Sequence, residues 1–174
     1  APMIANDLVL VVPCYNEEGN LRGTIEAING ALASSNRFSA HEILIYNDRS
    51  TDATGALADS IAKADRSVKV IHNAKNMGFG FNYTDGVKRA TKDYIMMVPG
   101  DNEIPAMAIE TVLAKAGEAD VIIPYTANPK VRPLSRRVIS RAFVGLINAM
   151  FGLNLIYYNG TCLVKSRLLK KVPL

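Results

Sequence analysis

Three polar side chains that can bind a cation follow directly after an apolar stretch of the sequence. Residues 94–98 are apolar or aromatic, a Pro-Gly pair breaks the run, and Asp101, Asn102 and Glu103 come next. This pattern predicts a buried strand that ends in an acidic loop. Carboxylate and amide oxygens bind hard cations such as Mg²⁺. The loop is therefore a candidate metal site, although the same residues could also serve only to cap the next helix.

Three earlier predicted strands are followed by polar or glycine-rich loops in the same way. The strands cover residues 8–12, 42–46 and 68–72, and the loops cover residues 13–17, 47–52 and 76–80. Because the carboxyl ends of parallel strands meet at one edge of a sheet, we expect all four loops to lie together. Such an edge can hold a nucleotide, with the ring of Tyr15, carboxylates for the base and ribose, and an Asp that holds a cation on the diphosphate.

Helical patterns separate these predicted strands. Apolar residues recur at helical spacing after each loop, and a fifth apolar run covers residues 121–124. Strands that alternate with helices in this way predict an α/β domain with a mainly parallel central sheet. We expect helices over residues 18–34, over a segment capped by Ser50 or Thr51 that reaches Ala64, over a segment that ends near Thr91, and over residues 105–116.

The charge of the chain is unevenly distributed. Residues 1–125 carry 11 Lys or Arg and 16 Asp or Glu, whereas residues 126–174 carry nine basic residues and no acidic one. We therefore predict a core over residues 1–125 and a basic segment over residues 126–174. The basic segment implies an anionic partner, such as a phosphate or a membrane surface, or is only a solvated surface. We expect no nucleic acid, because the segment lacks interleaved aromatic residues before Tyr157.

The basic segment contains a predicted helix. Arg132 and Arg136 are four residues apart, as are Arg137 and Arg141, so a helix would stack the guanidinium groups near one end. Residues 142–164 contain no charged residue, and a run of this length could in principle cross a bilayer. Its asparagines and glycines make it too polar for that. The pattern favours an amphipathic helix at a membrane interface or on the core.

The cysteines and the N-terminal residues bear on location. Cys14 and Cys162 form no disulfide framework, which favours a reducing compartment. No signal peptide is visible, because the first apolar run is only six residues long, from Leu8 to Pro13, and charged residues flank it. We expect a cytoplasmic protein. The sequence stops at Leu174, a few residues into a Lys/Arg-rich helix, so we also expect the native chain to continue.

Other polar residues are expected to have no part in chemistry. His41 and His72 flank strands and are expected to be structural, and Asp85 is expected to be only a surface charge. No G-x-G-x-x-G motif follows the first strand, which disfavours a nicotinamide dehydrogenase.

Four motifs together resemble the GT-A fold glycosyltransferases of family 2, and within them the polyprenyl-phosphate sugar synthases of the dolichyl-phosphate mannose synthase type. Residues 11–18 (VVPCYNEE) look like the P-x-Y-N-E motif of this family, and residues 47–54 (NDRSTDAT) are similar to its D-D-G-S-x-D-x-T motif. Residues 76–80 (NMGFG) resemble its N-x-G-x-G block, and residues 132–141 (RPLSRRVISR) look like its acceptor-side segment. The resemblance covers roughly residues 8–172.

The resemblance implies a Rossmann-like, three-layer α/β/α GT-A fold, with a nucleotide-sugar-binding core over residues 1–125. It implies a divalent cation, Mn²⁺ or Mg²⁺, held by Asp101, with Glu103 as a second candidate ligand. It implies a nucleotide-diphosphate sugar donor, contacted by Pro13, Tyr15, Glu17, Asp48, Asn76 and Gly78. It also implies an acceptor phosphate bound by Arg132, Arg136, Arg137 and Arg141, with Asp101, Arg136 and Arg137 as the catalytic residues.

The sequence departs from the family pattern in three places. Asn47 stands for the first Asp of D-D-G-S and Arg49 for its Gly, which bears on the choice of base. Pro99 stands for the first Asp of the D-x-D motif, so one metal-binding carboxylate is missing. Residues 157–163 replace the usual D-x-T-S-G-F-R, which leaves the acceptor open.

The absence of acidic residues after Asp120 bears on the acceptor. A hydroxyl acceptor needs a general base, whereas a lipid phosphate is already an anionic nucleophile and needs only cations to position it. We therefore predict an inverting transfer of a sugar to a polyprenyl phosphate, by a protein bound to the cytoplasmic membrane face. Two alternatives stay open. The acceptor could be a hydroxyl group with Asp101, Glu103 or a residue absent from this sequence as the base, or the fold could be a non-catalytic module that binds nucleotides or membranes.

Overall fold

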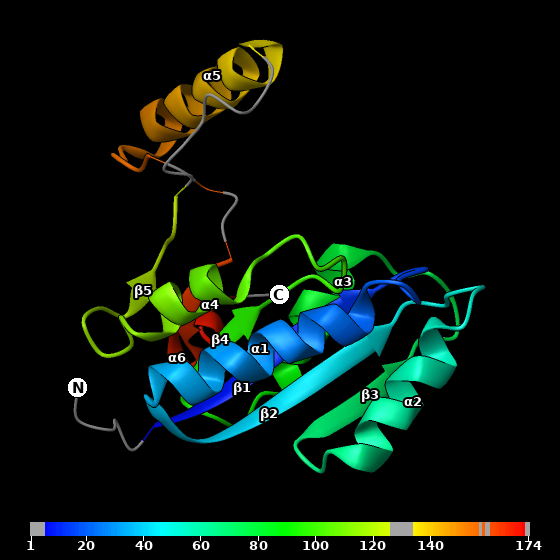
Figure 1. Cartoon of the computed structure of the whole chain (residues 1–174). Coiled ribbons are helices and arrows are strands. Elements are labelled where there is room, and N and C mark those ends of the chain that lie inside the picture. The colour runs from blue at the N-terminus through cyan, green and yellow to red at the C-terminus, as the bar shows by residue number, and fades with distance from the viewer. Residues whose placement is uncertain (1–5, 126–133, 157, 159–160, 173–174) are drawn as a thin grey trace. The chain divides into compact units, whose positions relative to one another are not determined.

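The structure is a computed structural model that describes residues 6–125, 134–156, 158 and 161–172 (Figure 1). The chain divides into two compact units. The first consists of Ala1–Ile122 and Cys162–Leu174, and the second of Ile123–Thr161. We describe each unit by itself. The predicted boundary at residue 126 lies close to the start of the second unit, whereas the last strand and helix belong to the first.

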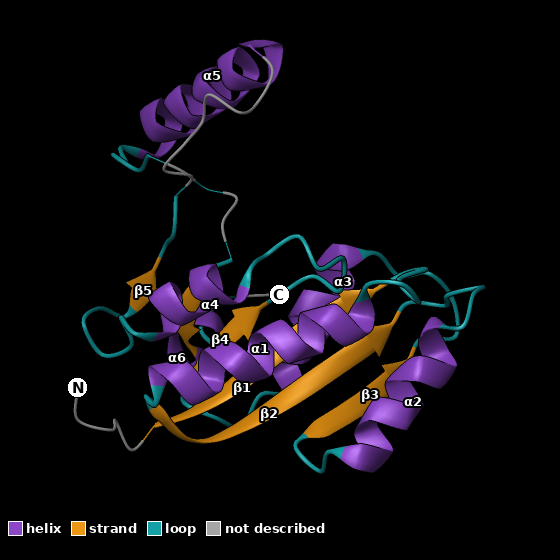
Figure 2. Ribbon diagram, in the orientation of Figure 1, coloured by secondary structure: helices purple, strands orange, loops and turns teal. Residues whose placement is uncertain are grey.

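A six-stranded sheet forms the centre of the first unit (Figure 2). Its strands are β1 (Asn6–Cys14), β2 (Phe38–Asn47), β3 (Val68–His72), β4 (Tyr94–Met97), β5 (Val121–Ile122) and β6 (Leu163–Lys165), in the order β3-β2-β1-β4-β6-β5. The pairs β3–β2, β2–β1 and β1–β4 are parallel, and β6 runs antiparallel to both β4 and β5. The mainly parallel sheet predicted from the sequence is confirmed.

Helices cover both faces of the sheet. They are α1 (Leu21–Ser35), α2 (Thr54–Ala64), α3 (Phe79–Arg89), α4 (Ala106–Leu113) and α6 (Ser166–Leu169). Alternate residues of β1 face the two layers: Leu8 and Leu10 pack in the cluster that contains α1, α2 and α4, while Val9 and Val11 pack in the cluster that contains α3 and α6. A strand buried on both faces reads as a continuous apolar run, which is why β1 was visible in the sequence.

Two details of this unit differ from the sequence prediction. Neither Ser50 nor Thr51 caps α2. The helix begins later, and Asp52 Oδ1 accepts a hydrogen bond from the backbone N–H of Thr54 at 3.0 Å. Strand β6 was not predicted, because it has only three residues and lies at the end of a long uncharged run.

The second unit consists largely of helix α5 (Leu134–Phe151). The helix ends at Phe151, and the next residue, Gly152, has a φ of 62°, in the left-handed region that glycine adopts easily. Asn148 ties the following turn to the helix, because its side chain accepts from the N–H of Leu155 at 3.1 Å and from the Tyr158 hydroxyl at 2.6 Å. Among the described residues, no helix combines the length and the apolar character that a membrane crossing requires.

Candidate active site

A pocket of about 300 Å³ opens at the carboxyl edge of the sheet, where the four predicted loops meet. It includes every residue that the sequence predicts to bind the nucleotide, together with Asp101. Its lining consists of Pro13, Cys14, Tyr15, Glu17, Asp48, Asn76, Gly78, Phe79, Asn82, Pro99, Gly100 and Asp101. The volume lies at the lower end of the range for small-molecule sites. The predicted convergence of the loops is thus present in the fold.

The loop after β1 is held by the loop after β2. The backbone N–H of Asn16 donates to Ser50 Oγ at 3.0 Å, and the N–H of Glu17 donates to Thr54 Oγ1 at 2.7 Å. In return, Asn16 Oδ1 accepts from the N–H of Thr51 at 2.8 Å. These bonds fix the backbone directly after Tyr15, whose side chain is 49% exposed and lines the pocket.

Asp48 is the buried carboxylate of the pocket. Its Oδ1 accepts from the N–H of Met77 and the side-chain amide of Asn73, and its Oδ2 accepts from the N–H of Gly78, all at 2.8 Å. Burial by itself would raise the pKa of Asp48, but these donors and Asn82 outweigh it, so the pKa lies below its ordinary value. Asp48 therefore stays ionised and anchors the loop after β3.

Asp101 lies at the other end of the pocket, after β4. A side chain at Gly100 would clash with the Cys14 sulfur, so this position needs glycine. The Asp101 Oδ1 accepts from the N–H of Glu103 at 3.1 Å, which closes a local turn of the loop. Burial raises the pKa of the Cys14 thiol to about 12, and the charges of Glu17 and Asp101 add to this effect. Cys14 is thus a neutral wall of the pocket.

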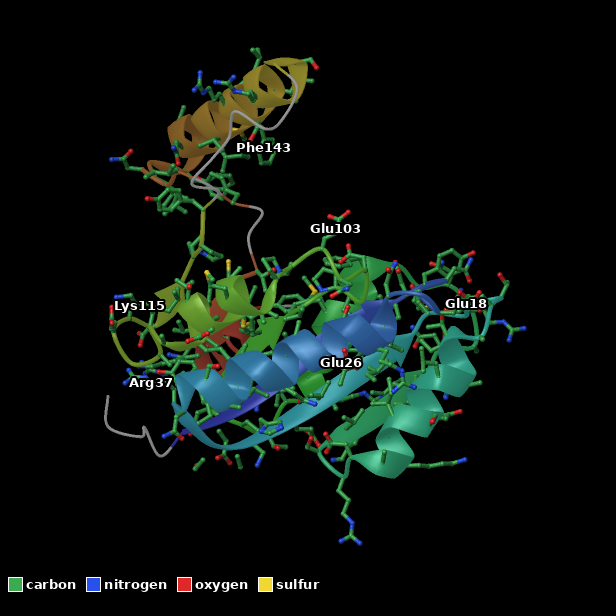
Figure 3. All side chains as sticks on the ribbon, viewed as in Figure 1. Glu18, Glu26, Arg37, Glu103, Lys115 and Phe143 are labelled. Atoms are coloured by element: carbon green, nitrogen blue, oxygen red, sulfur yellow. The ribbon has the colours of Figure 1, made fainter. Side chains whose placement is uncertain are left out.

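The remaining residues of this acidic loop point elsewhere. Glu103 is exposed, is not among the residues that line the pocket, and points into solvent (Figure 3). Asn102 has a φ of 56°, and its N–H donates to Thr24 Oγ1 at 3.0 Å. Of the three polar residues in this loop, Asp101 is the one that faces the pocket.

The family model for glycosyl transferase family 2 matches residues 9–171. The chain belongs to this family. It is 28% identical over 155 residues to the undecaprenyl-phosphate mannosyltransferase of Micrococcus luteus, which covers 85% of this chain and 61% of that protein. It is 33% identical over 115 residues to the putative glycosyltransferase EpsH of Bacillus subtilis, covering 66% of this chain and 32% of that one. The chain thus spans less than two thirds of both relatives.

A solved structure places the domain in the GT-A fold. It is the glucosyl-3-phosphoglycerate synthase of Mycobacterium tuberculosis in complex with Mn²⁺, UDP-glucose and phosphoglyceric acid, with a TM-score of 0.68 and 18% identity. The match covers 97% of this chain and 60% of that one. Identity at this level shows the fold alone. The predicted family and fold are both confirmed.

The two departures in the D-D-G-S motif of this family 2 domain have structural consequences. The Asn47 amide hydrogen-bonds His72 Nδ1 at 2.9 Å, and His72 Nε2 contacts Asp59 Oδ1 at 3.0 Å. His72 therefore links the end of β2 to α2. Arg49 keeps a φ of 65°, the left-handed conformation that suits the glycine of the family motif.

The family resemblance implies a divalent cation, and the donor set of the pocket is compatible with one. No group of three His, Cys, Asp or Glu side chains in the described parts of the chain could hold a metal ion. Mg²⁺-type ions are commonly bound by one or two carboxylates plus the phosphates of the substrate. Asp101 can provide one such carboxylate, and Pro99 beside it provides none.

The predicted acceptor arginines lie in the second unit, apart from Arg132, which falls outside the described residues. Arg136 is part of α5, where Arg137 is half-buried and Arg141 is exposed. The structure thus places three of the four on one helix. Their spacing of four residues between Arg137 and Arg141 corresponds to neighbouring turns of that helix.

The sequence prediction for Asp85, on α3, is wrong. Asp85 is more than a surface charge, because its Oδ2 accepts a hydrogen bond from the buried Tyr46 hydroxyl at 2.8 Å and pairs with Arg89 at 2.5 Å. Burial and this contact with Asp85 raise the pKa of Tyr46. The four-residue spacing of Asp85 and Arg89 was a visible signal, but nothing in the sequence linked them to β2.

Proposed function

We propose that this domain transfers a sugar from a nucleoside diphosphate sugar to a polyprenyl phosphate, with inversion at the anomeric carbon. The observation that carries the donor half is the single pocket that joins Tyr15, Glu17 and Asp48 at one end to Asp101 at the other. Aromatic and carboxylate groups suit a nucleoside, and a lone carboxylate suits an ion on the diphosphate.

The charge distribution supports the acceptor half. The chain has no acidic residue after Asp120, whereas α5 carries Arg136, Arg137 and Arg141. Guanidinium groups bind phosphate through paired hydrogen bonds and remain charged at any physiological pH. The undecaprenyl-phosphate mannosyltransferase named above, among the relatives, uses an acceptor of this kind by its name.

The reaction needs no general base on this acceptor. An oxygen of the lipid phosphate attacks the anomeric carbon while the bond from that carbon to the diphosphate oxygen breaks, and the nucleoside diphosphate leaves with the electron pair. No proton has to be removed, because the nucleophile is already an anion. A bound divalent ion would neutralise charge on the diphosphate, and Asp101 would hold it.

We also propose that the domain works at the cytoplasmic face of an anionic membrane. Helix α5 presents large exposed apolar side chains in the same helix as its arginines, including Val138, Ile139, Leu146 and Met150. A helix with apolar and cationic groups of this kind can lie in a lipid headgroup region. This location would bring the arginines to the level of a lipid phosphate.

A transfer assay tests the proposal. Labelled UDP- and GDP-sugars are offered with undecaprenyl phosphate and, separately, with a hydroxyl acceptor such as phosphoglyceric acid. We expect product only with the lipid phosphate. The double variant Arg136→Ala/Arg137→Ala should lower lipid transfer about tenfold or more, with nucleotide binding unchanged, whereas Lys63→Ala on α2 should have no effect.

Three results would contradict the proposal. Unchanged lipid transfer in the double arginine variant would exclude these residues as the phosphate site. Transfer only to the hydroxyl acceptor would support the alternative that uses a general base. Binding of nucleotide sugars without transfer to either acceptor would support a non-catalytic module.

A further inference from the structure

We infer that Phe79 forms a second aromatic contact for the nucleobase of the donor, beside Tyr15; this inference rests on the proposed function. Phe79 is 51% exposed and lines the same pocket as Tyr15. An exposed phenylalanine ring gains free energy when a flat apolar surface covers it. Every nucleobase offers such a surface, because each has a π-face.

The backbone before Phe79 is fixed at the nucleoside end of the pocket. Gly78 has a φ of 82°, and its N–H and that of Met77 both donate to the carboxylate of Asp48. Phe79 follows directly as the first residue of α3. Phe79 therefore follows directly after a loop that is hydrogen-bonded to Asp48.

The strand order places this loop far along the edge from Asp101. In the strand order β3-β2-β1-β4, the loop after β3 neighbours the loop after β2, which contains Asp48. The loop after β4, which contains Asp101, lies on the other side of β1. A donor whose diphosphate lies at Asp101 would extend its nucleoside towards Asp48 and Phe79. Tyr15 lies on the loop after β1, between the loops of Asp48 and Asp101, and would contact the same nucleoside.

Phe81 provides a matched comparison on the same helix. It is 41% exposed, close to the value for Phe79, yet it lines a different surface pocket together with Ile71, His72 and Arg89. The two rings share a residue type, a helix and a degree of exposure. They differ in whether they face the pocket of Asp48 and Asp101.

Base stacking tolerates different bases, whereas hydrogen bonds select among them. Phe79 should therefore raise the affinity for uridine and guanosine nucleotides alike. We expect Phe79→Leu to weaken the binding of UDP and GDP about tenfold, to whatever extent each binds the wild type. Phe79→Tyr keeps the ring and should bind within about twofold of the wild type.

The test is calorimetric titration of the full chain with UDP and with GDP, for the wild type, Phe79→Leu, Phe79→Tyr and Phe81→Leu. Phe81→Leu should bind like the wild type. A second readout separates contact from indirect effects. With 4-fluorophenylalanine in place of phenylalanine, the fluorine resonance lost in Phe79→Leu should shift on addition of nucleotide, and the resonance lost in Phe81→Leu should stay.

The outcomes distinguish this inference from the proposed function. If the wild type binds neither nucleotide, the proposed function fails, and the role of Phe79 fails with it. If the wild type binds and Phe79→Leu binds equally well, only the role of Phe79 is excluded. If Phe79→Leu binds weakly but the fluorine resonance of Phe79 does not move, the ring acts through the loop and the direct contact is excluded.

Discussion

The pocket edge of the first unit, formed by the loops after β1, β2, β3 and β4, differs from helix α5 of the second unit in where its charged groups lie. At the pocket edge, the buried carboxylate of Asp48 accepts hydrogen bonds from Asn73, Met77 and Gly78. On α5, Arg141 and large apolar side chains such as Ile139 are exposed. A polar site with its hydrogen bonds already formed suits a soluble, charged donor, whereas an exposed cationic and apolar surface suits a lipid phosphate.

The largest effect should follow from Asp101→Asn, which removes one negative charge from the pocket. The amide oxygen can still accept from the N–H of Glu103, so stability should change by less than about 0.5 kcal/mol. We expect sugar transfer to fall about 100-fold, because the charge that would hold an ion on the leaving group is lost. Initial rates at saturating donor, with Mn²⁺ or Mg²⁺, measure this.

Two further variants sharpen the result. Glu103→Gln should have a much smaller effect, because Glu103 does not line the pocket. Glu110→Gln on α4 serves as a control for the loss of one charge. Equal losses for Asp101→Asn and Glu103→Gln would mean that both carboxylates hold the ion, and an unchanged rate in Asp101→Asn would remove the metal role altogether.

The second prediction concerns the anchor of the pocket edge. Asp48→Asn puts an amide where a carboxylate accepts from buried donors, so we expect a loss of about 2 kcal/mol in the free energy of unfolding at pH 7. The pKa of Asp48 is lowered in the folded state, so its contribution is complete above its unfolded pKa and disappears as the pH falls through the folded value. Urea unfolding between pH 7 and pH 2 tests this.

The wild type and Asp48→Asn should therefore differ most near neutral pH and converge in acid. Glu26→Gln, on the exposed face of α1, is the control. Its free energy of unfolding should equal that of the wild type at every pH. A constant gap between wild type and Asp48→Asn at every pH would mean that the ionised carboxylate is not what holds the loop.

The sequence predicted the pocket edge well for a physical reason. Buried parallel strands are continuous apolar runs, and each run here stops at a polar loop, so the parallel topology alone brings Tyr15, Asp48 and Asp101 to one place. The hydrogen bonds between the loops of that edge could not be predicted from the sequence. That Asp48 is committed to Met77 and Gly78 depends on the register of two loops 30 residues apart, which no local pattern encodes.

Other features left weak or misleading signals. Strand β6 follows a long uncharged run, and its three residues pair with β4 through long-range contacts only. Phe79 occupies an unspecified position of the N-x-G-x-G block, so the motif assigns it no role. Asp85 owes its role to a hydroxyl on a distant strand. Each of these depends on tertiary neighbours, which override local propensity.

A third prediction addresses the other region, α5. Ile139→Glu places a charge on an exposed apolar position, 68% exposed, and should weaken binding to vesicles that contain anionic lipid about tenfold. Stability should change little, because the side chain is already exposed. Co-sedimentation with phosphatidylglycerol vesicles measures the binding.

Met107→Glu is the matched control, since Met107 is 76% exposed but belongs to α4 of the first unit. It should leave vesicle binding within about twofold of the wild type. Equal losses in both variants would show only a general effect of negative charge, and unchanged binding in Ile139→Glu would remove α5 as the membrane contact.

The smallest effect is expected at Arg49, in the loop after β2 at the pocket edge. Its φ of 65° costs a non-glycine residue about 1 kcal/mol, while glycine costs somewhat less than that through the entropy of the unfolded chain. Arg49→Gly should therefore stabilise the fold by about 0.5 kcal/mol in urea unfolding.

Asn36→Gly is the control, because asparagine tolerates its φ of 43° and little should change. If Arg49→Gly were destabilising, the arginine side chain would have to make contacts worth more than the backbone strain. A loss of nucleotide affinity in a stabilised Arg49→Gly would instead mean that this chain replaced the glycine of its family in order to contact the donor.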